Sequence, residues 1–210
     1  AMNGTDSLVL LPTGHGKSLI FQIAALVLPG ATLVVEAWRA LIDDQVRVLQ
    51  DRGISRVVAI HKDRQLDGNL LSALIIYVAP ERLYVESFQK PLNQLLRQVG
   101  LDLLVIDEAH AVSEAGHSFR PSYLGLVDRM AERTQAASRN RPPTLALTAT
   151  AANIVIRDIG GILNIKAPPI TLVEETTGKA FVRENLLDEV IEVSSSEGDA
   201  GIMRSIHSVL

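Results

Sequence analysis

The chain has 210 residues, of which 47% are hydrophobic and 21% are charged, and this composition fits one globular domain of ordinary size. Its apolar runs are far shorter than the roughly 18 residues of a membrane-spanning helix, so we expect no membrane segment. The formal net charge of −4 gives no argument for nucleic-acid binding from charge alone. The absence of cysteine excludes disulfides and thiolate metal sites, and it favours a cytoplasmic location.

Short apolar, β-branched segments alternate along the chain with longer segments of helical period. This alternation predicts an α/β fold, a doubly wound, mostly parallel sheet flanked by helices. Several predicted strands are apolar throughout, as expected where helices cover both faces of a sheet. We predict strands at residues 7–11, 32–36, 56–60, 73–78, 101–107, 144–148 and 170–174. We predict helices at residues 17–27, 39–51, 81–98, 123–137 and 153–163.

The ends of the chain differ in character from its middle. Residues 1–6 are interpreted as a tag remnant or disordered start, and residues 7–177 as one nucleotide-binding domain. The composition changes from Thr176 onward. We therefore predict that residues 178–210 form a linker and the truncated beginning of a second domain, with a strand at 189–193 and a helix at 200–210.

The segment LPTGHGKS, residues 11–18, lies between a predicted strand and a predicted helix, which is the context of a phosphate-binding loop. Glycines permit backbone N–H groups to face a polyphosphate, and the helix N-terminus favours its negative charge. Lys17 is assigned to the β- and γ-phosphates of ATP and the Ser18 hydroxyl to Mg²⁺. The alternative is a glycine turn with an exposed lysine. The predicted nucleotide-binding residues are Thr13, Gly14, His15, Gly16, Lys17 and Ser18.

An acidic motif, DEAH at residues 107–110, follows the predicted strand 101–107. Ligands of doubly wound sheets bind at the carboxyl ends of strands, so this motif and the glycine loop are expected to meet. Asp107 is assigned to Mg²⁺, and Glu108 to the water that attacks the γ-phosphate. The alternative is an ordinary acidic first turn of a helix. The predicted catalytic residues are Lys17, Asp107, Glu108 and His110.

A third motif, ALTATA at residues 146–151, places Thr148 and Thr150 at the end of another predicted strand. Their hydroxyls are suited to link His110 to a neighbouring domain by hydrogen bonds. The alternative is the routine occurrence of threonine in strands and helix caps.

The ordered segments LPTGHGKS, ALIDDQV, YVAPERL, VIDEAH, GHSFRPSY and ALTATA resemble the superfamily two helicases, and within them the RecQ family, over about residues 8–165. The resemblance implies the first RecA-like lobe of an ATP-dependent DNA helicase, using Mg²⁺ and single-stranded DNA. It also implies that a second lobe completes the active site, so the lobe alone is expected to hydrolyse ATP very slowly.

The resemblance further implies that the loop after the DEAH box couples DNA to ATP hydrolysis through His117, Phe119 and Arg120. Phe119 is suited to stack on a base, and Arg120 to reach a phosphate or the nucleotide site. The alternative is a capping loop whose phenylalanine packs in the core.

Two departures from the family pattern bear on DNA contact. Ala115 stands where the family has tryptophan, and Glu36 and Ala37 stand where it has Ser-Pro. A carboxylate beside a phosphate track is unfavourable. Trp38 is either a substitute stacking surface or, as the favoured alternative, a core residue. Rival functions are an ATP-dependent nucleic-acid clamp or switch without unwinding, and a small-molecule kinase.

Overall fold

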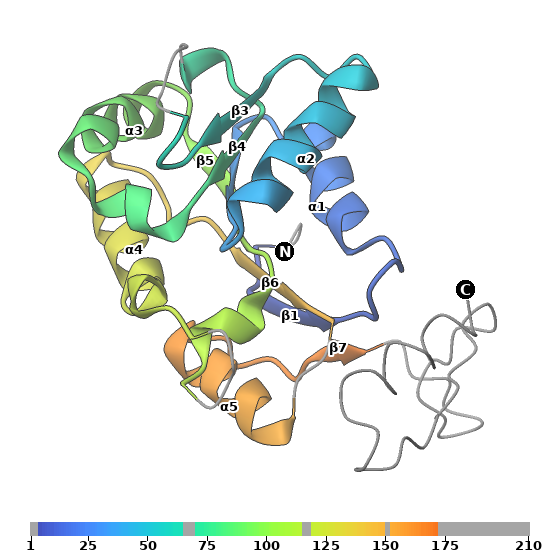
Figure 1. The fold of residues 1–210 in the computed structure, drawn as a ribbon. Coiled ribbons are helices and arrows are strands. Elements are labelled where there is room, and N and C mark those ends of the chain that lie inside the picture. Colours follow the sequence, from blue (N-terminus) through green and yellow to red (C-terminus); the bar gives the residue numbers. More distant parts are fainter. Residues whose placement is uncertain (1–3, 65–69, 115–118, 150–151, 172–210) are drawn as a thin grey trace, which may run out of the picture. The chain divides into compact units, whose positions relative to one another are not determined.

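The computed structural model describes residues 4–64, 70–114, 119–149 and 152–171 (Figure 1). The chain divides into two compact units, Ala1–Leu172 and Val173–Leu210, and the second unit lies outside the described residues. The predicted domain boundary at residue 177, the linker and the second domain therefore stay predictions.

The described part of the chain contains a seven-stranded sheet with the order β3-β4-β2-β5-β6-β1-β7. Every recorded strand pair is parallel, so the mostly parallel sheet of the prediction is parallel throughout these strands. The strands are β1 (Ser7–Leu10), β2 (Ala31–Val35), β3 (Val57–Ile60), β4 (Ile75–Val78), β5 (Leu101–Ile106), β6 (Thr144–Thr148) and β7 (Ile170–Thr171).

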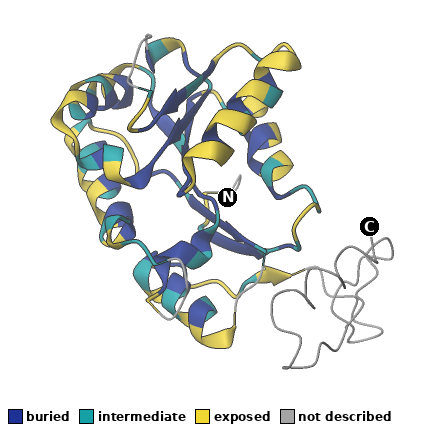
Figure 2. Ribbon diagram, in the orientation of Figure 1, coloured by how far each residue is buried: buried dark blue, intermediate teal, exposed yellow. Residues whose placement is uncertain are grey.

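Helices cover both faces of this sheet (Figure 1). One face carries α1 (Lys17–Val27) and α2 (Arg39–Asp51), and the other carries α3 (Glu86–Gln98), α4 (Leu126–Ala136) and α5 (Asn153–Ile162). Successive strand residues point to opposite faces, so Val34 packs in the layer under α1 and α2 while Val35 packs in the other. Buried residues accordingly follow the strands and the inner faces of the helices (Figure 2). The predicted doubly wound α/β fold is confirmed.

Two predicted helices are shorter than the sequence pattern suggested. Residues 81–98 form a 3₁₀ turn, η2 (Pro80–Tyr84), and then α3, because Val85 between them has an extended backbone. Residues 123–137 become helical only at Leu126, after Gly125 with φ of 66°. Three more 3₁₀ turns are described: η1 (Leu70–Ser72), η3 (Ala109–Val112) and η4 (Pro121–Tyr123). None of the described helices is long and apolar enough to cross a membrane.

Candidate nucleotide site and adjoining pocket

The three chemical motifs lie at the carboxyl ends of adjacent strands. The glycine loop follows β1, the DEAH motif follows β5, and Thr148 ends β6, which lies between them. The backbone N–H of Leu11 donates to the carbonyl of Thr148 at 3.1 Å, which ties the start of the loop to β6. The sheet order therefore brings the glycine loop together with two motifs that lie about ninety or more residues further along the chain.

The glycine loop has the backbone that a phosphate cradle needs. Gly14 and Gly16 have φ of 82° and 78°, in the left-handed region that favours glycine. Gly16 is the N-cap of α1, and no side chain caps this helix end. Its first N–H groups and its partial positive charge are thus left for a phosphate. Lys17 is 9% exposed, and its ammonium group donates to the carbonyl of Leu11 at 3.3 Å, across the loop.

A chain of two glutamines holds Ser18, the predicted Mg²⁺ ligand. Gln45 Nε2 of α2 donates to Ser18 Oγ at 3.1 Å, and Gln22 Nε2 donates to Gln45 Oε1 at 2.8 Å. Gln45 belongs to the ALIDDQV segment, which resembles a family motif, and no role was predicted for it. Its spacing gives no sign of this contact, because α2 reaches the loop only through tertiary packing.

The DEAH carboxylates differ in burial and in the direction in which their pKa values are shifted. Burial raises the pKa of Asp107 from 3.8 to about 6, and the nearby charge of Glu108 adds to this, while the N–H of Glu108 and the charge of Lys17 oppose it. Asp107 is 7% exposed. The hydrogen bond with His110 lowers the pKa of Glu108, and so does the charge of Lys17. Lys17 therefore acts electrostatically on both acids, as the predicted convergence requires.

Glu108 has an unusual backbone for a residue with a side chain. Its φ of 45° lies in the left-handed region, where non-glycine residues are strained, and such strain clusters at functional sites. Glu108 Oε2 lies 3.2 Å from His110 Nδ1, which in turn lies 3.2 Å from Thr148 Oγ1. The DEAH motif is thus joined to β6 through His110. Thr150 lies outside the described residues.

The donor set fits magnesium bound to a polyphosphate. The Ser18 hydroxyl and the Asp107 carboxylate are the hard oxygen ligands that Mg²⁺ prefers, in addition to waters and substrate phosphates. The raised pKa of Asp107 also means that its charged form lacks compensation, which a divalent cation would supply.

Glu36, one of the two departures from the family pattern, directly follows β2 and is buried. It is 2% exposed, and its Oε1 accepts a hydrogen bond from the backbone N–H of Trp38 at 2.8 Å. Burial raises its pKa from 4.5 to about 8, and the charge of Asp107 adds to this. The expectation of a charged carboxylate beside a phosphate track is therefore wrong, since this group is buried and mostly protonated near neutral pH.

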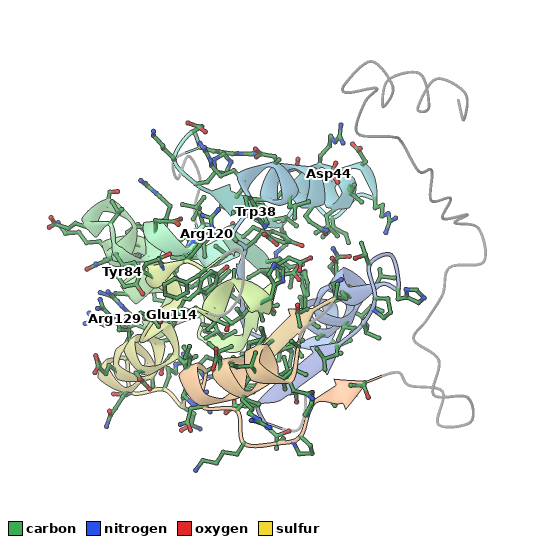
Figure 3. The ribbon with its side chains drawn as sticks, turned by 60° about the horizontal axis from the view of Figure 1, so that its bottom comes forward. Trp38, Asp44, Tyr84, Glu114, Arg120 and Arg129 are labelled. Atoms are coloured by element: carbon green, nitrogen blue, oxygen red, sulfur yellow. The ribbon has the colours of Figure 1, made fainter. Side chains whose placement is uncertain are left out.

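A cavity of about 480 Å³ opens next to this edge, beyond the ends of β2 and β4. Trp38 is 44% exposed there, so its interpretation as a core residue is wrong. The guanidinium carbon of Arg120 lies 4.9 Å from the centroid of the Trp38 ring, and both side chains are labelled in Figure 3. Arg120 Nη1 lies 3.1 Å from Glu81 Oε1. The cavity is lined by Ala37, Trp38, Arg39, Lys62, Ala79, Glu81, Arg82, Val85 and Arg120.

The structure describes only part of the predicted coupling loop. Phe119 is partly buried, which leaves its two interpretations open. His117 and Ala115 lie outside the described residues. Arg120 was predicted to reach a phosphate or the nucleotide site, and in the structure it lies against Trp38 and Glu81.

Residues 1–159 match the family model described as DEAD/DEAH box helicase. The chain belongs to this family. Among curated proteins, this helicase domain is 38% identical over 173 residues to the ATP-dependent DNA helicase RecQ of Haemophilus influenzae, covering 79% of this chain and 26% of that protein. It is 39% identical over 172 residues to the ATP-dependent DNA helicase Q5 of Rattus norvegicus, covering 78% of this chain and 17% of that protein. The RecQ resemblance predicted from the motifs is confirmed.

Solved helicase structures share the fold of this DEAD/DEAH box domain at low sequence identity. The Hef helicase domain of Pyrococcus furiosus is 20% identical with a TM-score of 0.58, covering 81% of this chain and 35% of that one. The helicase MrfA, solved with DNA and AMPPNP, is 18% identical with a TM-score of 0.60, covering 82% of this chain and 25% of that one. The chain spans about a quarter of the RecQ relative's length, so the activity of a whole protein does not follow from these matches.

Proposed function

We propose that this domain binds Mg-ATP at the edge formed by β1, β5 and β6, as the motor lobe of an ATP-dependent DNA helicase. The observation that carries the proposal is that the glycine loop after β1 and the acids Asp107 and Glu108 after β5 lie at the same edge of the sheet, with only β6 between the two strands. The charge of Lys17 lowers the pKa of both acids. Membership of the DEAD/DEAH box helicase family supports it.

The proposed roles follow from the contacts of each side chain. Lys17 and the uncapped N-terminus of α1 bind the phosphates, and Thr13, Gly14, His15 and Gly16 form the loop around them. Ser18 and Asp107 hold Mg²⁺, which when bound neutralises charge on the phosphate oxygens.

Glu108 orients the attacking water and accepts its proton at the carboxylate. The hydrogen bond with His110 lowers the pKa of this carboxylate and orients it. Thr148 holds His110 from the end of β6, and Thr150 follows two residues later in the same motif. In this proposal, His110 and the two threonines report hydrolysis to a neighbouring lobe.

The motor is proposed to act on single-stranded DNA within a longer protein, where a second lobe completes the ATP site. Hydrolysis by this domain alone is expected to be very slow. A cytoplasmic location also stays a prediction. A full-length protein that hydrolyses ATP in response to single-stranded DNA but separates no duplex would favour the clamp function instead.

The nucleotide site is tested by titrating the chain with a fluorescent ATP analogue in the presence of Mg²⁺. Lys17→Ala is expected to weaken binding about ten- to a hundredfold, because it removes hydrogen bonds to charged phosphate oxygens. Lys166→Ala, at an exposed lysine outside the site, serves as the matched control and keeps full affinity. Equal affinity in Lys17→Ala and the unmodified chain would refute the assigned site.

A further inference from the structure

A second cavity, of about 250 Å³, opens between α3 and α4, on the face of the sheet away from α1 and α2. This α3–α4 cavity is lined by Asn93, Arg97, Glu132, Arg133, Ala136 and Ala137. Arg97 lies in the last turn of α3, and Arg133 lies in the last turn of α4. The strands that follow these two turns, β5 and β6, have the proposed nucleotide site at their carboxyl ends. The cavity therefore lies toward the opposite edge of the sheet from that site.

Four arginines gather around the α3–α4 cavity. Arg97 and Arg133 line it. Arg139 Nη2 donates to the backbone carbonyl of Arg97 at 3.2 Å, and Arg129 precedes Arg133 by one turn of α4. Glu132 is the one carboxylate among the described residues of the lining. This excess of positive charge is local, because the chain as a whole has a net charge of −4.

Neutral groups hold these arginines in place. Arg133 Nη1 donates to Asn93 Oδ1 of α3 at 2.9 Å, and Arg139 donates to a backbone carbonyl. The guanidinium carbon of Arg129 lies 4.7 Å from the centroid of the Tyr84 ring, and both side chains are labelled in Figure 3. No ion pair is recorded for any of the four arginines within the part of the chain that the structure describes. Their charge is thus oriented without being neutralised, which favours the binding of an anion.

The kind of anion follows from the size and the chemistry of the cavity. A guanidinium group pairs with both oxygens of a carboxylate, so two such groups on one cavity suit an acidic side chain. The volume of about 250 Å³ is below the roughly 300–1,000 Å³ of small-molecule sites, which favours a side chain of a partner over a whole cofactor. The described lining has no aromatic ring, whereas sites for single-stranded nucleic acid combine such rings with cations.

We propose that the α3–α4 cavity is a docking site for an acidic segment of a partner protein. One carboxylate of this segment lies between Arg97 and Arg133, and neighbouring carboxylates face Arg129 and Arg139. Charge complementarity carries the proposal, since the four cations surround a cavity on a chain that is otherwise acidic. A partner docked here leaves the opposite sheet edge open to ATP. The inference goes beyond the proposed function and does not depend on it.

The docking site is tested by fluorescence anisotropy with a labelled synthetic peptide of about twelve residues that repeats Asp-Glu-Ala. The 210-residue chain is expected to bind this peptide at low ionic strength, to bind it more weakly as salt is added, and not to bind a matching Asn-Gln-Ala peptide. Arg97→Glu is expected to weaken binding about tenfold or more, because attraction is replaced by repulsion. Arg52→Glu, at the exposed C-cap of α2, changes the net charge equally and is expected to have little effect.

Two further variants separate docking from a general effect of charge. Glu132→Gln removes the carboxylate of the lining and is expected to strengthen peptide binding about two- to fivefold, because a like charge is lost. Arg139→Glu, in the loop after α4, is an independent charge reversal, expected to weaken binding less than Arg97→Glu because Arg139 does not line the cavity. Thermal unfolding and ATP-analogue affinity are measured for each variant, and both are expected to show a folded chain with an unchanged nucleotide site.

Three outcomes would overturn the proposal. The first is the absence of binding between the unmodified chain and the acidic peptide. The second is an equal loss of affinity in Arg97→Glu and Arg52→Glu, which would show attraction to the cations of the chain in general. The third is displacement of the peptide by a thymidine oligonucleotide of equal charge at lower concentration than by unlabelled peptide, which would identify a nucleic-acid site. None of these results depends on nucleotide affinity, which Lys17→Ala tests, so the two proposals fail separately.

Discussion

Two neighbouring regions of one sheet edge differ in how their side chains are held. At the ends of β1, β5 and β6, each functional group is bonded to another part of the same site, as Ser18 is to Gln45 and His110 is to Thr148. In the Trp38 cavity, Arg39 and Arg120 bond to surface carboxylates, and Lys62 and Arg82 have no such partner in the described part of the chain. The first region is preorganised for one ligand geometry, whereas the second suits an extended, variable ligand.

The two regions also differ in the sign of their charge. Glu108, whose pKa is lowered, and Asp107, whose pKa of about 6 lies below neutral pH, carry the negative charge at the strand ends, whereas the pKa of about 8 keeps the buried Glu36 largely uncharged at pH 7. The cavity has an excess of cations at the surface. The first region combines carboxylates with Lys17 and the uncapped N-terminus of α1, which suits a magnesium-bound phosphate, whereas in the cavity cations outnumber carboxylates.

The largest expected effect comes from the rigid geometry of the glycine loop. Gly16→Ala forces a methyl group into a backbone with φ of 78° and places its Cβ 3.4 Å from Leu19 Cδ1. The left-handed conformation costs a residue with a side chain about 1–2 kcal/mol, and the methyl group also approaches the phosphate position. We expect ATP-analogue affinity to fall about a hundredfold or more, measured by titration.

Gly53→Ala is the matched control for this substitution. Gly53 has a similar φ of 83°, with open space around its Cβ position, and it lies after α2, away from the loop. The Gly53→Ala variant is expected to lose about as much folding stability as Gly16→Ala and to keep its nucleotide affinity. If both variants lost affinity alike, general destabilisation would explain the result, and the contrast between a rigid and an adaptable region would be lost.

The second prediction concerns Glu36, which lies where the two regions meet. Its pKa in the folded chain, about 8, is above its ordinary value of 4.5. The unfolded chain therefore releases this proton first, and stability is lost as the pH rises from about 4.5 to about 8. Glu36→Gln keeps an acceptor for the Trp38 N–H but removes the buried charge. We expect it to stabilise the fold by about 2 kcal/mol at pH 9 and by little at pH 4.

This difference is measured by chemical denaturation of both chains across that pH range. Glu132→Gln, at an exposed glutamate on α4, is the control and leaves the pH dependence unchanged. If Glu36→Gln also left it unchanged, the carboxylate would be charged and compensated in the folded protein. The region around Trp38 would then carry less positive potential than the contacts indicate.

The same contrast explains what the sequence predicted and what it did not. The glycine loop and the DEAH motif each follow a strand directly, so parallel topology alone was enough to place Lys17 near Asp107. The burial of Glu36, the exposure of Trp38 and the reach of Gln45 depend on how α2 packs, which no local pattern encodes. The interruption at Val85 was missed for a similar reason, since residues on both sides of it have helical periodicity.

The smallest expected effect tests whether the nucleotide region depends on a residue that motif spacing did not identify. Gln45→Ala removes the donor to Ser18 Oγ and the acceptor for Gln22, at 3.1 and 2.8 Å. Each neutral hydrogen bond contributes about 0.5–1.5 kcal/mol, and Ser18 would gain rotamer freedom. We expect affinity for the ATP analogue to fall about three- to tenfold in the presence of Mg²⁺, with a smaller loss in its absence. Gln50→Ala, on the exposed side of the same helix, provides the baseline. A loss independent of Mg²⁺ would mean that Gln45 supports the loop backbone and not the proposed metal ligand.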